Sequence, residues 1–190
     1  MAQITEVPPP GKRKSPTREL IESVVLALLV ALAIRVWVAE TYRVEGSSME
    51  HTLRDGERVL VAKFVYKWVR KPERGDIVVF LYPKDPEKAF IKRVVGLPGD
   101  RVEVKGGKVL VNGQVMEEVS TAIPAEMDSP VETVPDGSVW VLGDNRNNSE
   151  DSRFFGEVPY DLIRGPAFIR IWPLYRVTLF HNPVPPAGRR

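Results

Sequence analysis

Residues 90–100 have the sequence FIKRVVGLPGD, an apolar run that carries two adjacent cations, Lys92 and Arg93, and leads into a Gly/Pro turn. Runs of branched and aromatic residues that stop at glycine and proline are typical of β-strands. Side chains alternate along a strand, so the two cations fall on opposite faces. Two interpretations follow: an edge strand in which both cations are partly solvated, or an interior strand that buries Lys92.

The chain after Tyr42 consists of similar short runs with turn signals between them. These runs have the apolar or alternating pattern of strands and occupy residues 58–62, 76–81, 102–104, 109–111, 138–142 and 167–172. Gly106-Gly107 and Asn112-Gly113 predict tight hairpin turns, whereas residues 120–136 predict an irregular excursion. Strands this short and frequent predict a mostly β protein, a compact antiparallel and barrel-like domain with little helix.

The composition of the chain limits its class. With 43% hydrophobic residues, the 190-residue chain can bury a real core, so disorder is excluded as the overall state. The net charge of +2 is too small to indicate a nucleic-acid partner. The absence of cysteine excludes disulfides, thiol catalysis and thiolate metal sites.

A basic arm, residues 1–18, precedes an apolar segment, residues 19–39. The apolar segment is close to the roughly 20 residues that span a bilayer, and no polar face interrupts residues 24–34. We therefore expect a single transmembrane anchor. The cations before it place the N-terminus in the cytoplasm and the following domain outside. Two alternatives remain, a cleaved signal peptide and a soluble core helix, although no convincing small-residue cleavage site ends the segment.

Ser48 lies in the sequence GSSM, residues 46–49, just beyond the apolar segment. A serine in a tight turn can expose its hydroxyl, although such a segment is also a plain connector. Arginine stays protonated whereas a buried lysine can lose its proton, so only Lys92 could be a general base. If it is, Ser48 is the expected nucleophile of a membrane-tethered hydrolase. His51 suggests a serine–histidine site instead, but such sites are defined by geometry and not by sequence proximity.

Residues 143–153, GDNRNNSEDSR, form a polar run after a strongly apolar strand. A solvated turn is the simplest interpretation. A calcium loop does not fit, because Arg146 and Ser149 stand where such a loop needs an oxygen ligand and a glycine. Asp151 and Arg153 are spaced to share one face of a strand and to pair, with Ser149 on the same side. The glycine-rich turns elsewhere lack a following Gly-Lys-Ser/Thr, so no phosphate loop is predicted.

In chain order, four segments resemble the boxes of the bacterial type I signal peptidases (leader peptidases). Residues 48–53 resemble a Ser-Met-x-Pro-Thr-Leu box, and residues 75–80 match Gly-Asp-Ile-Val-Val-Phe. Residues 92–100 match Lys-Arg-x-x-Gly-x-Pro-Gly-Asp, and residues 143–153 match Gly-Asp-Asn-Arg-x-x-Ser-x-Asp-Ser-Arg. Four boxes in the same order are far more specific than any one of them.

The resemblance implies a membrane-bound serine endopeptidase that removes signal peptides from exported preproteins through a serine–lysine dyad and an acyl-enzyme. Ser48 would be the nucleophile and Lys92 the general base, with Arg93 in a structural role. Ser149 would orient the Lys92 amine. The residues that would hold and shape the supporting loop are Asp144, Asn145, Asp151 and Arg153. No metal and no other cofactor is implied.

The resemblance also implies partners and topology. The partners would be signal peptides and the lipid bilayer, with the secretion translocon as a further candidate and no nucleic acid. The catalytic β domain, residues 40–180, would lie on the extracytoplasmic side of the plasma membrane, or at a thylakoid membrane. It would contain a short second subdomain at about residues 101–138 and end in a flexible tail, residues 181–190.

Three positions depart from the family pattern. His51 replaces the proline of the serine box but leaves the spacing intact. Gly46 stands where some members have a serine whose hydroxyl helps the oxyanion hole, so the Ser48 backbone N–H would carry more of that role. Asn147 stands where an acidic residue is frequent.

Two other functions fit parts of the pattern. One is a membrane-tethered β domain that binds peptides without cutting them, including an inactive homologue. The other is a LexA-like serine–lysine protein that cleaves itself, which would need a DNA-binding helix-turn-helix in place of the anchor. No such motif is visible in the sequence.

Overall fold

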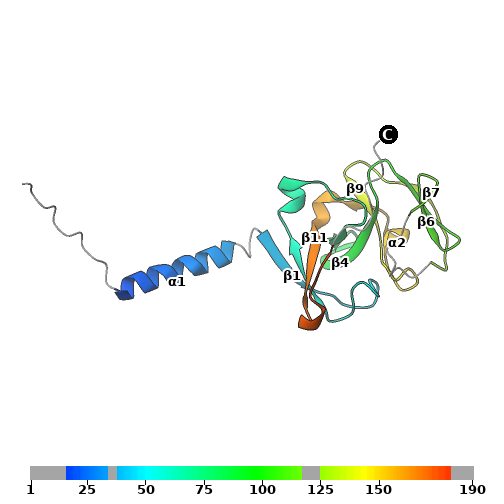
Figure 1. The fold of residues 1–190 in the computed structure, drawn as a ribbon. Coiled ribbons are helices and arrows are strands. Elements are labelled where there is room, and N and C mark those ends of the chain that lie inside the picture. The colour runs from blue at the N-terminus through cyan, green and yellow to red at the C-terminus, as the bar shows by residue number, and fades with distance from the viewer. Residues whose placement is uncertain (1–15, 34–37, 117–124, 181–190) are drawn as a thin grey trace, which may run out of the picture.

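The computed structural model describes residues 16–33, 38–116 and 125–180 of the chain. One helix, α1 (Pro16–Ala33), comes first, and a β domain of two antiparallel sheets follows it (Figure 1). Every strand pairing in the two sheets is antiparallel among the described residues. The prediction of a mostly β, antiparallel fold is therefore confirmed.

The larger sheet has eight strands and carries the residues of the predicted site. Its order is β1-β2-β11-β3-β4-β9-β10, and β12 pairs with β11. The strands are β1 (Ala39–Arg43), β2 (Arg58–Ala62), β3 (Ile77–Tyr82), β4 (Asp85–Gly96), β9 (Ser138–Leu142), β10 (Val158–Pro159), β11 (Ile163–Trp172) and β12 (Thr178–Leu179). The long strand β4 is interior, between β3 and β9, so its centre is covered by hydrogen-bonded neighbours on both sides.

The smaller sheet has four strands in the order β7-β6-β5-β8. The strands are β5 (Arg101–Lys105), β6 (Lys108–Val111), β7 (Gln114–Val115) and β8 (Ser129–Thr133). Gly106 and Gly107 make the turn between β5 and β6 with positive φ, as the double glycine predicts. The Asn112-Gly113 turn joins β6 to β7 in the same way.

Short helices connect the strands. They are a π-helix η2 (Val65–Val69), an α-helix α2 (Ser152–Phe155) and two 3₁₀ turns, η3 (Tyr160–Leu162) and η4 (Leu174–Arg176). Little helix was expected beyond the N-terminal segment, and the described helices after α1 are all of five residues or fewer.

One segment differs from the sequence-based expectation. Residues 120–136 were expected to be irregular, but Ser129–Thr133 forms strand β8 and pairs with β5. Pro130 argues against a strand because it has no N–H to donate, yet β8 lies at the edge of its sheet, where proline is tolerated. The strand expected at residues 167–172 is also longer and begins at Ile163.

Three buried clusters fill the domain. Val94 and Val95, neighbours near the end of β4, point into different clusters: Val94 packs with Phe80 in the larger sheet, and Val95 packs with Trp140 and the smaller sheet. The third cluster contains Met49 and Leu53, both with no exposed surface, which belong to the segment after Ser48. The serine turn is therefore anchored in the core through its apolar residues.

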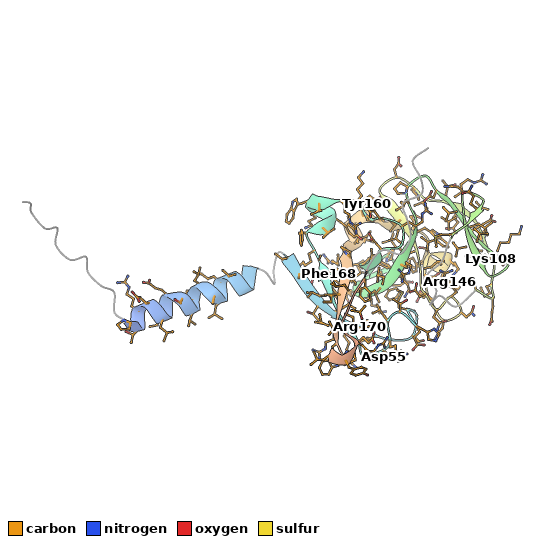
Figure 2. All side chains as sticks on the ribbon, in the orientation of Figure 1. Asp55, Lys108, Arg146, Tyr160, Phe168 and Arg170 are labelled. Atoms are coloured by element: carbon orange, nitrogen blue, oxygen red, sulfur yellow. The ribbon has the colours of Figure 1, made fainter. Side chains whose placement is uncertain are left out.

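Helix α1 contains much of the predicted anchor. Its described side chains, residues 16–30, are all exposed, including large apolar ones such as Leu26 and Leu28. Figures 1 and 2 show α1 apart from the β domain. In the described part of the chain, no helix is both long enough and apolar enough to span a membrane. Residues 34–37 of the predicted anchor, most of the basic arm and the tail from residue 181 lie outside the described residues.

Gly96 ends β4 at the junction of the two sheets. An added Cβ there would lie 2.6 Å from a methyl group of Val102, 2.9 Å from Val134 and 3.0 Å from Trp140. These distances are shorter than a van der Waals contact, so the core at this point has no room for a side chain. Only glycine fits at position 96 without displacing these neighbours.

We therefore expect Gly96→Ala to lower the free energy of unfolding by about 1–3 kcal/mol through overpacking. Urea denaturation followed by tryptophan fluorescence would measure the loss. Val102→Ala removes the nearest methyl group, so the double variant should be more stable than the sum of the two single losses predicts. Strictly additive losses would contradict a packing origin.

Candidate active site

Ser48 lies in a tight turn after β1 whose backbone is held at several points. The Gly46 N–H donates to Asp55 Oδ1 at 2.8 Å, and Gly46 itself has φ +80°, a conformation that favours glycine. The Leu53 N–H donates to the Met49 carbonyl at 2.7 Å, and both side chains are buried. The turn thus holds Ser48, which is half-buried, in a fixed place on the domain.

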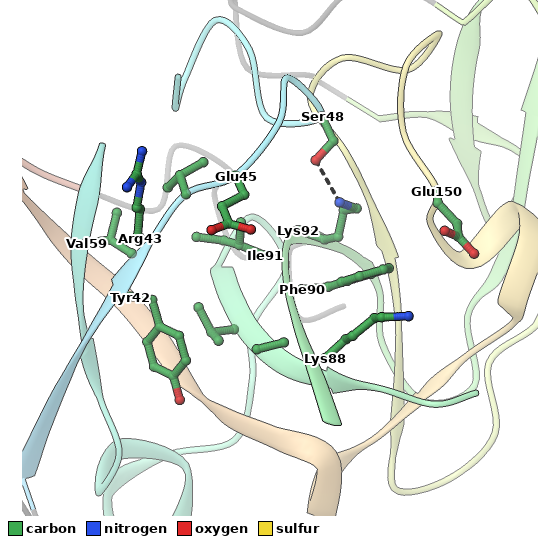
Figure 3. Close-up of a pocket in the computed structure, with 13 residues that line it drawn as sticks. Tyr42, Arg43, Glu45, Ser48, Val59, Lys88, Phe90, Ile91, Lys92 and Glu150 are labelled. Atoms are coloured by element: carbon green, nitrogen blue, oxygen red, sulfur yellow. Dashed lines mark hydrogen bonds between the residues drawn. The ribbon is translucent and has the colours of Figure 1, made fainter. Parts of the chain in front are cut away.

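Lys92 reaches Ser48 from the centre of β4. Its Nζ lies 2.8 Å from Ser48 Oγ, within hydrogen-bond distance, although the two residues are 44 positions apart (Figure 3). Lys92 is 5% exposed and its neighbour Arg93 is 4% exposed. The interpretation of residues 90–95 as an edge strand with solvated cations is therefore wrong, because β4 is interior and both cations are buried.

Burial changes the acid–base behaviour of Lys92. Loss of solvation lowers its pKa to about 8, whereas the nearby carboxylates of Asp151, Glu150 and Asp144 act in the opposite direction. The Phe90 ring, 5.3 Å from Nζ, forms part of the apolar surroundings. A pKa near neutral leaves a useful fraction of neutral amine, which can accept the Ser48 proton across the same short contact.

Arg93, on the opposite face of β4, keeps its charge and has a full set of partners. It donates to both oxygens of Asp144, at 2.8 and 2.7 Å, and to the Gly75 carbonyl at 2.8 Å. The Thr52 hydroxyl donates to Asp144 Oδ2 at 2.5 Å. Because Thr52 belongs to the serine turn, this buried network ties that turn to β4 and to the loop after β9.

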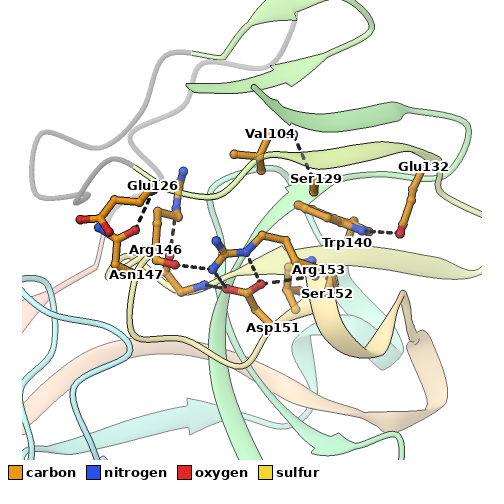
Figure 4. Close-up of polar contacts among 12 residues, drawn as sticks. Val104, Glu126, Ser129, Glu132, Trp140, Arg146, Asn147, Asp151, Ser152 and Arg153 are labelled. Atoms are coloured by element: carbon orange, nitrogen blue, oxygen red, sulfur yellow. Dashed lines mark hydrogen bonds and ion pairs between the residues drawn. The ribbon is translucent and has the colours of Figure 1, made fainter. Parts of the chain in front are cut away.

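Asp151 organises the loop of residues 143–153. Its carboxylate accepts from the Gly143 N–H at 3.1 Å and from Arg153 Nε and Nη2 at 2.8 and 2.9 Å. Arg153 also donates to the Arg146 carbonyl at 2.5 Å (Figure 4). The two residues pair as their spacing predicted, but not on a strand, since Asp151 is the N-cap of α2 and accepts from the Arg153 N–H.

The same loop contacts the serine turn directly. The Asn145 N–H donates to the Ser48 carbonyl at 3.0 Å, and the Asn148 side-chain amide donates to Ser47 Oγ at 2.6 Å. Ser149 was expected to orient the Lys92 amine. Its hydroxyl is buried and has no hydrogen-bond partner among the described residues, so that role stays a prediction.

The dyad opens into a cleft of about 490 Å³ between residues 42–45 and residues 88–92 of β4. Its apolar part is lined by Tyr42, Val59, Val79 and Ile91, and charged side chains stand at its rim (Figure 3). His51 is exposed and is absent from this lining, so a serine–histidine site has no support. No cluster of three or more potential metal ligands occurs among the described residues.

Several residues of the site were not singled out from the sequence. Thr52 and Asn148 hydrogen-bond to the loop and to the turn, but threonine and asparagine are common in turns and give no signal of their own. Glu150 lines the cleft, and its neighbours in the sequence gave no reason to choose it. The carboxylate partner of Arg93, in contrast, lies inside the predicted box.

Comparisons with known proteins match most of the chain. The family profile "Signal peptidase, peptidase S26" matches residues 17–172. The chain is 45% identical to "Probable signal peptidase I-2" of Synechocystis sp. over 177 residues, 88% of this chain and 81% of that protein. It is 45% identical to "Signal peptidase I" of Leptolyngbya laminosa over 87% of this chain and 85% of that protein. It is also 40% identical to "Thylakoidal processing peptidase 1, chloroplastic" of Arabidopsis thaliana, over 82% of this chain and 49% of that protein.

Gly143 packs where the loop meets the serine turn. A Cβ at this position would lie 2.5 Å from the Ser48 carbonyl oxygen and would overlap the Ser149 hydroxyl. The nearest atoms include backbone, which cannot rotate away as a flexible side chain can. A side chain here would displace the Ser48 backbone.

We expect Gly143→Ala to lower the rate of preprotein cleavage by about 10- to 100-fold, because sub-ångström to ångström shifts of a reacting group have effects of this size. Cleavage kinetics and circular dichroism together would test it. Lys108→Ala is the control, since Lys108 is exposed on β6 of the smaller sheet and does not line the cleft. Equal activity of the two variants would contradict the close packing at Ser48.

Proposed function

From its membership of the signal peptidase family, peptidase S26, we infer that this chain is a serine endopeptidase that removes signal peptides from preproteins, and we propose that Ser48 and Lys92 carry out the cleavage. One observation supports the dyad above all others: the 2.8 Å contact between Lys92 Nζ and Ser48 Oγ at the end of a cleft. A neutral amine within hydrogen-bond reach of a serine hydroxyl is the geometry of a base and its nucleophile.

The reaction begins with proton transfer. Neutral Lys92 takes the hydroxyl proton while Ser48 Oγ attacks the scissile carbonyl carbon and the carbonyl π electrons move to oxygen. Collapse of the tetrahedral intermediate breaks the C–N bond, and the Lys92 ammonium returns the proton to the leaving amine. The result is an ester between Ser48 and the signal peptide, with Lys92 neutral again.

Hydrolysis of the ester repeats these steps with water. Lys92 accepts a proton from the water molecule, the resulting hydroxide attacks the ester carbonyl, and the ammonium then protonates Ser48 Oγ as it leaves. The signal peptide departs with a new carboxylate. Every proton passes through one amine, so the pKa of Lys92 governs both halves of the reaction.

The negative charge on the carbonyl oxygen needs hydrogen-bond donors. The Gly46 N–H is engaged by Asp55, and glycine offers no hydroxyl. We propose the Ser48 backbone N–H as the principal donor. The Asn145 N–H bond to the Ser48 carbonyl and the Asn148 bond to Ser47 support this proposal, because both hold the peptide group that carries the donor.

We propose that the substrate binds as an added strand between residues 42–45 and residues 88–92. The cleft lies between these segments, and its apolar lining suits the small residues at the first and third positions before the cut. Tyr42 and Ile91 would bound the space available to those side chains. The limited volume would exclude large residues there.

We further propose that residues 19–39 anchor the enzyme in a membrane as a single span. The exposed apolar side chains of α1 support this, since lipid is an environment in which such a surface is stable. The cations of residues 12–18 would place the N-terminus in the cytoplasm and residues 40–180 on the extracytoplasmic side. The membrane would be the plasma membrane or a thylakoid membrane, where the translocon delivers preproteins.

Within this topology, residues 101–138 would form the short second subdomain, and residues 181–190 would be a flexible tail. A domain that binds peptides without cutting them would share the cleft but would not need a desolvated amine at the serine. A LexA-like protein would need a DNA-binding module before the β domain, whereas the described residues there form α1.

We expect Ser48→Ala and Lys92→Ala each to lower kcat/KM for preprotein cleavage in detergent by at least about 10³-fold, because the two residues act as one unit. The fraction of preprotein processed over time measures the loss. Variants that cut as fast as the wild type would contradict the dyad.

His51→Ala is the control for a histidine base and should keep most of the activity. A fall to the level of Ser48→Ala would instead favour a serine–histidine site. Circular dichroism of all three variants establishes that the changes act on chemistry and not on folding.

The pH dependence follows from the burial of Lys92. The active form is the neutral amine, so kcat/KM should fall about tenfold per pH unit below a pKa of about 8 and level off above it. Phe90→Ala admits water to the amine and should move this acid limb to higher pH. Tyr175→Ala removes an exposed aromatic residue outside the cleft and should leave the limb in place. A limb that stays fixed in Phe90→Ala would contradict desolvation as the cause.

A further inference from the structure

Glu150 is a charged residue of the cleft that the cleavage mechanism leaves without a role. It lines the same cleft as Ser48 and Lys92, yet no step of proton transfer requires it. It belongs to the loop of residues 143–153, whose other two carboxylates are each held by an arginine. No cation forms an ion pair with Glu150 among the described residues, since the nearby Lys88 pairs with Asp85, so its carboxylate can meet a ligand.

The Glu150 carboxylate is held in position. Its Oε1 accepts a hydrogen bond from the Tyr82 hydroxyl at 2.6 Å. The Tyr82 ring stacks on Phe90 at 4.6 Å, with the ring planes 14° apart, and Phe90 is itself part of the cleft wall. The neighbouring Asp151 fixes the backbone. Oε2 has no hydrogen bond among the described residues, which leaves one oxygen free to meet a substrate.

The other charges at the rim are arranged differently. Lys88 lines the cleft on the same strand face as Phe90 and Lys92. Its Nζ pairs with Asp85 at 2.8 Å and is also attracted by the Glu150 charge at longer range. Glu45 stands on the opposite side of the dyad, next to the apolar part of the cleft (Figure 3). Glu150 is therefore the carboxylate that faces the far side of the dyad from Tyr42 and Val59.

The position of Glu150 relates to the direction of the bound chain. If the residues before the cut occupy the apolar part of the cleft, with the scissile carbonyl at Ser48, the residues after the cut must continue past the dyad on the Glu150 side. Those residues become the N-terminus of the mature protein. A carboxylate at this place meets their side chains and not those of the signal peptide.

We propose that Glu150 is a specificity-determining residue that reads the charge of the first two residues after the cut, favouring a basic side chain and disfavouring an acidic one. This inference rests on the proposed function, because it uses the dyad to set the position of the peptide. The Coulomb effect of Glu150 on Lys92 supports it, since the charge is felt at the reacting atoms. Exposed pairs of this kind change affinity by a few fold.

The test uses three peptides that differ only at the second residue after the cut, which is lysine, glutamine or glutamate. We expect the full-length wild type to cleave the lysine peptide with a kcat/KM about three- to tenfold above that of the glutamate peptide at low salt. Glu150→Gln should bring this ratio close to one, and Glu150→Lys should invert it. Raising the salt concentration should shrink the wild-type ratio.

The ratio cancels any effect of Glu150 on the pKa of Lys92, because both peptides meet the same base. Glu103→Gln is the matched control: it removes the same charge from β5 of the other sheet and should keep the wild-type ratio. A wild-type ratio near one, or an unchanged ratio in Glu150→Gln, would overturn this inference alone. A chain that cuts none of the three peptides would overturn the proposed function as well.

Discussion

The site depends on one constraint: strand β4 buries two adjacent cations and gives only one of them a counter-ion. Arg93 meets Asp144 through two hydrogen bonds on one face, while Lys92 meets a serine hydroxyl and a phenylalanine ring on the other. Burying a charge is very unfavourable unless it is paired, and a lysine can respond by releasing its proton, whereas an arginine cannot. The same burial thus gives a permanent charge that holds the structure and a neutral amine that can act as a base. The interior position of β4, between β3 and β9, is what makes both outcomes necessary.

The pairing of Arg93 with Asp144 also explains how three distant segments meet. Asp144 belongs to the loop after β9, Thr52 to the serine turn and Arg93 to β4, and all three share one buried carboxylate. A buried ion pair stabilises little beyond the cost of removing its charges from water, but it strongly disfavours arrangements that leave one partner alone. Its value here is positional: the loop after β9 cannot move away from β4 without leaving an unpaired charge in the interior, and the Thr52 hydroxyl bond to Asp144 ties the serine turn to this pair. Met49 and Leu53 add apolar burial to the same restraint.

Much of this could be predicted from the sequence, for identifiable reasons. Strands bounded by glycine and proline turns, such as β2, β5, β6 and β9, follow from local pattern because each has a clear period and a clear stop. The burial of Lys92 could not be derived locally, since alternation does not say which strands of a sheet are interior, and β4 lies between β3 and β9. Strand β8 was missed because Pro130 argues against a strand, and only its edge position in the sheet removes that objection. The pairing of Asp151 with Arg153 was predicted correctly, but on a strand. The two residues stand at the start of helix α2, because a spacing of two residues suits both a strand face and a helix N-cap. The role proposed for Glu150 could not be predicted from the sequence, because it depends only on the position of this residue in the cleft beside Ser48 and Lys92.

The acidic residues near the dyad show how the site balances opposing electrostatic demands. Asp144, Glu150 and Asp151 all raise the pKa of Lys92 and so act against the desolvation that lowers it. Asp144 and Asp151 hold the loop and the turn, and each is paired with an arginine. Glu150 is neither paired with a cation nor required for these contacts, yet it is oriented by Tyr82. Glu150 raises the pKa of Lys92 and so lowers the fraction of neutral amine. An interaction with the substrate best explains why such a carboxylate is held at the rim of the cleft. Among the described residues, Glu150 is therefore the acidic residue near Lys92 that is outside any ion pair, and it is the one that can discriminate between preproteins by their charge.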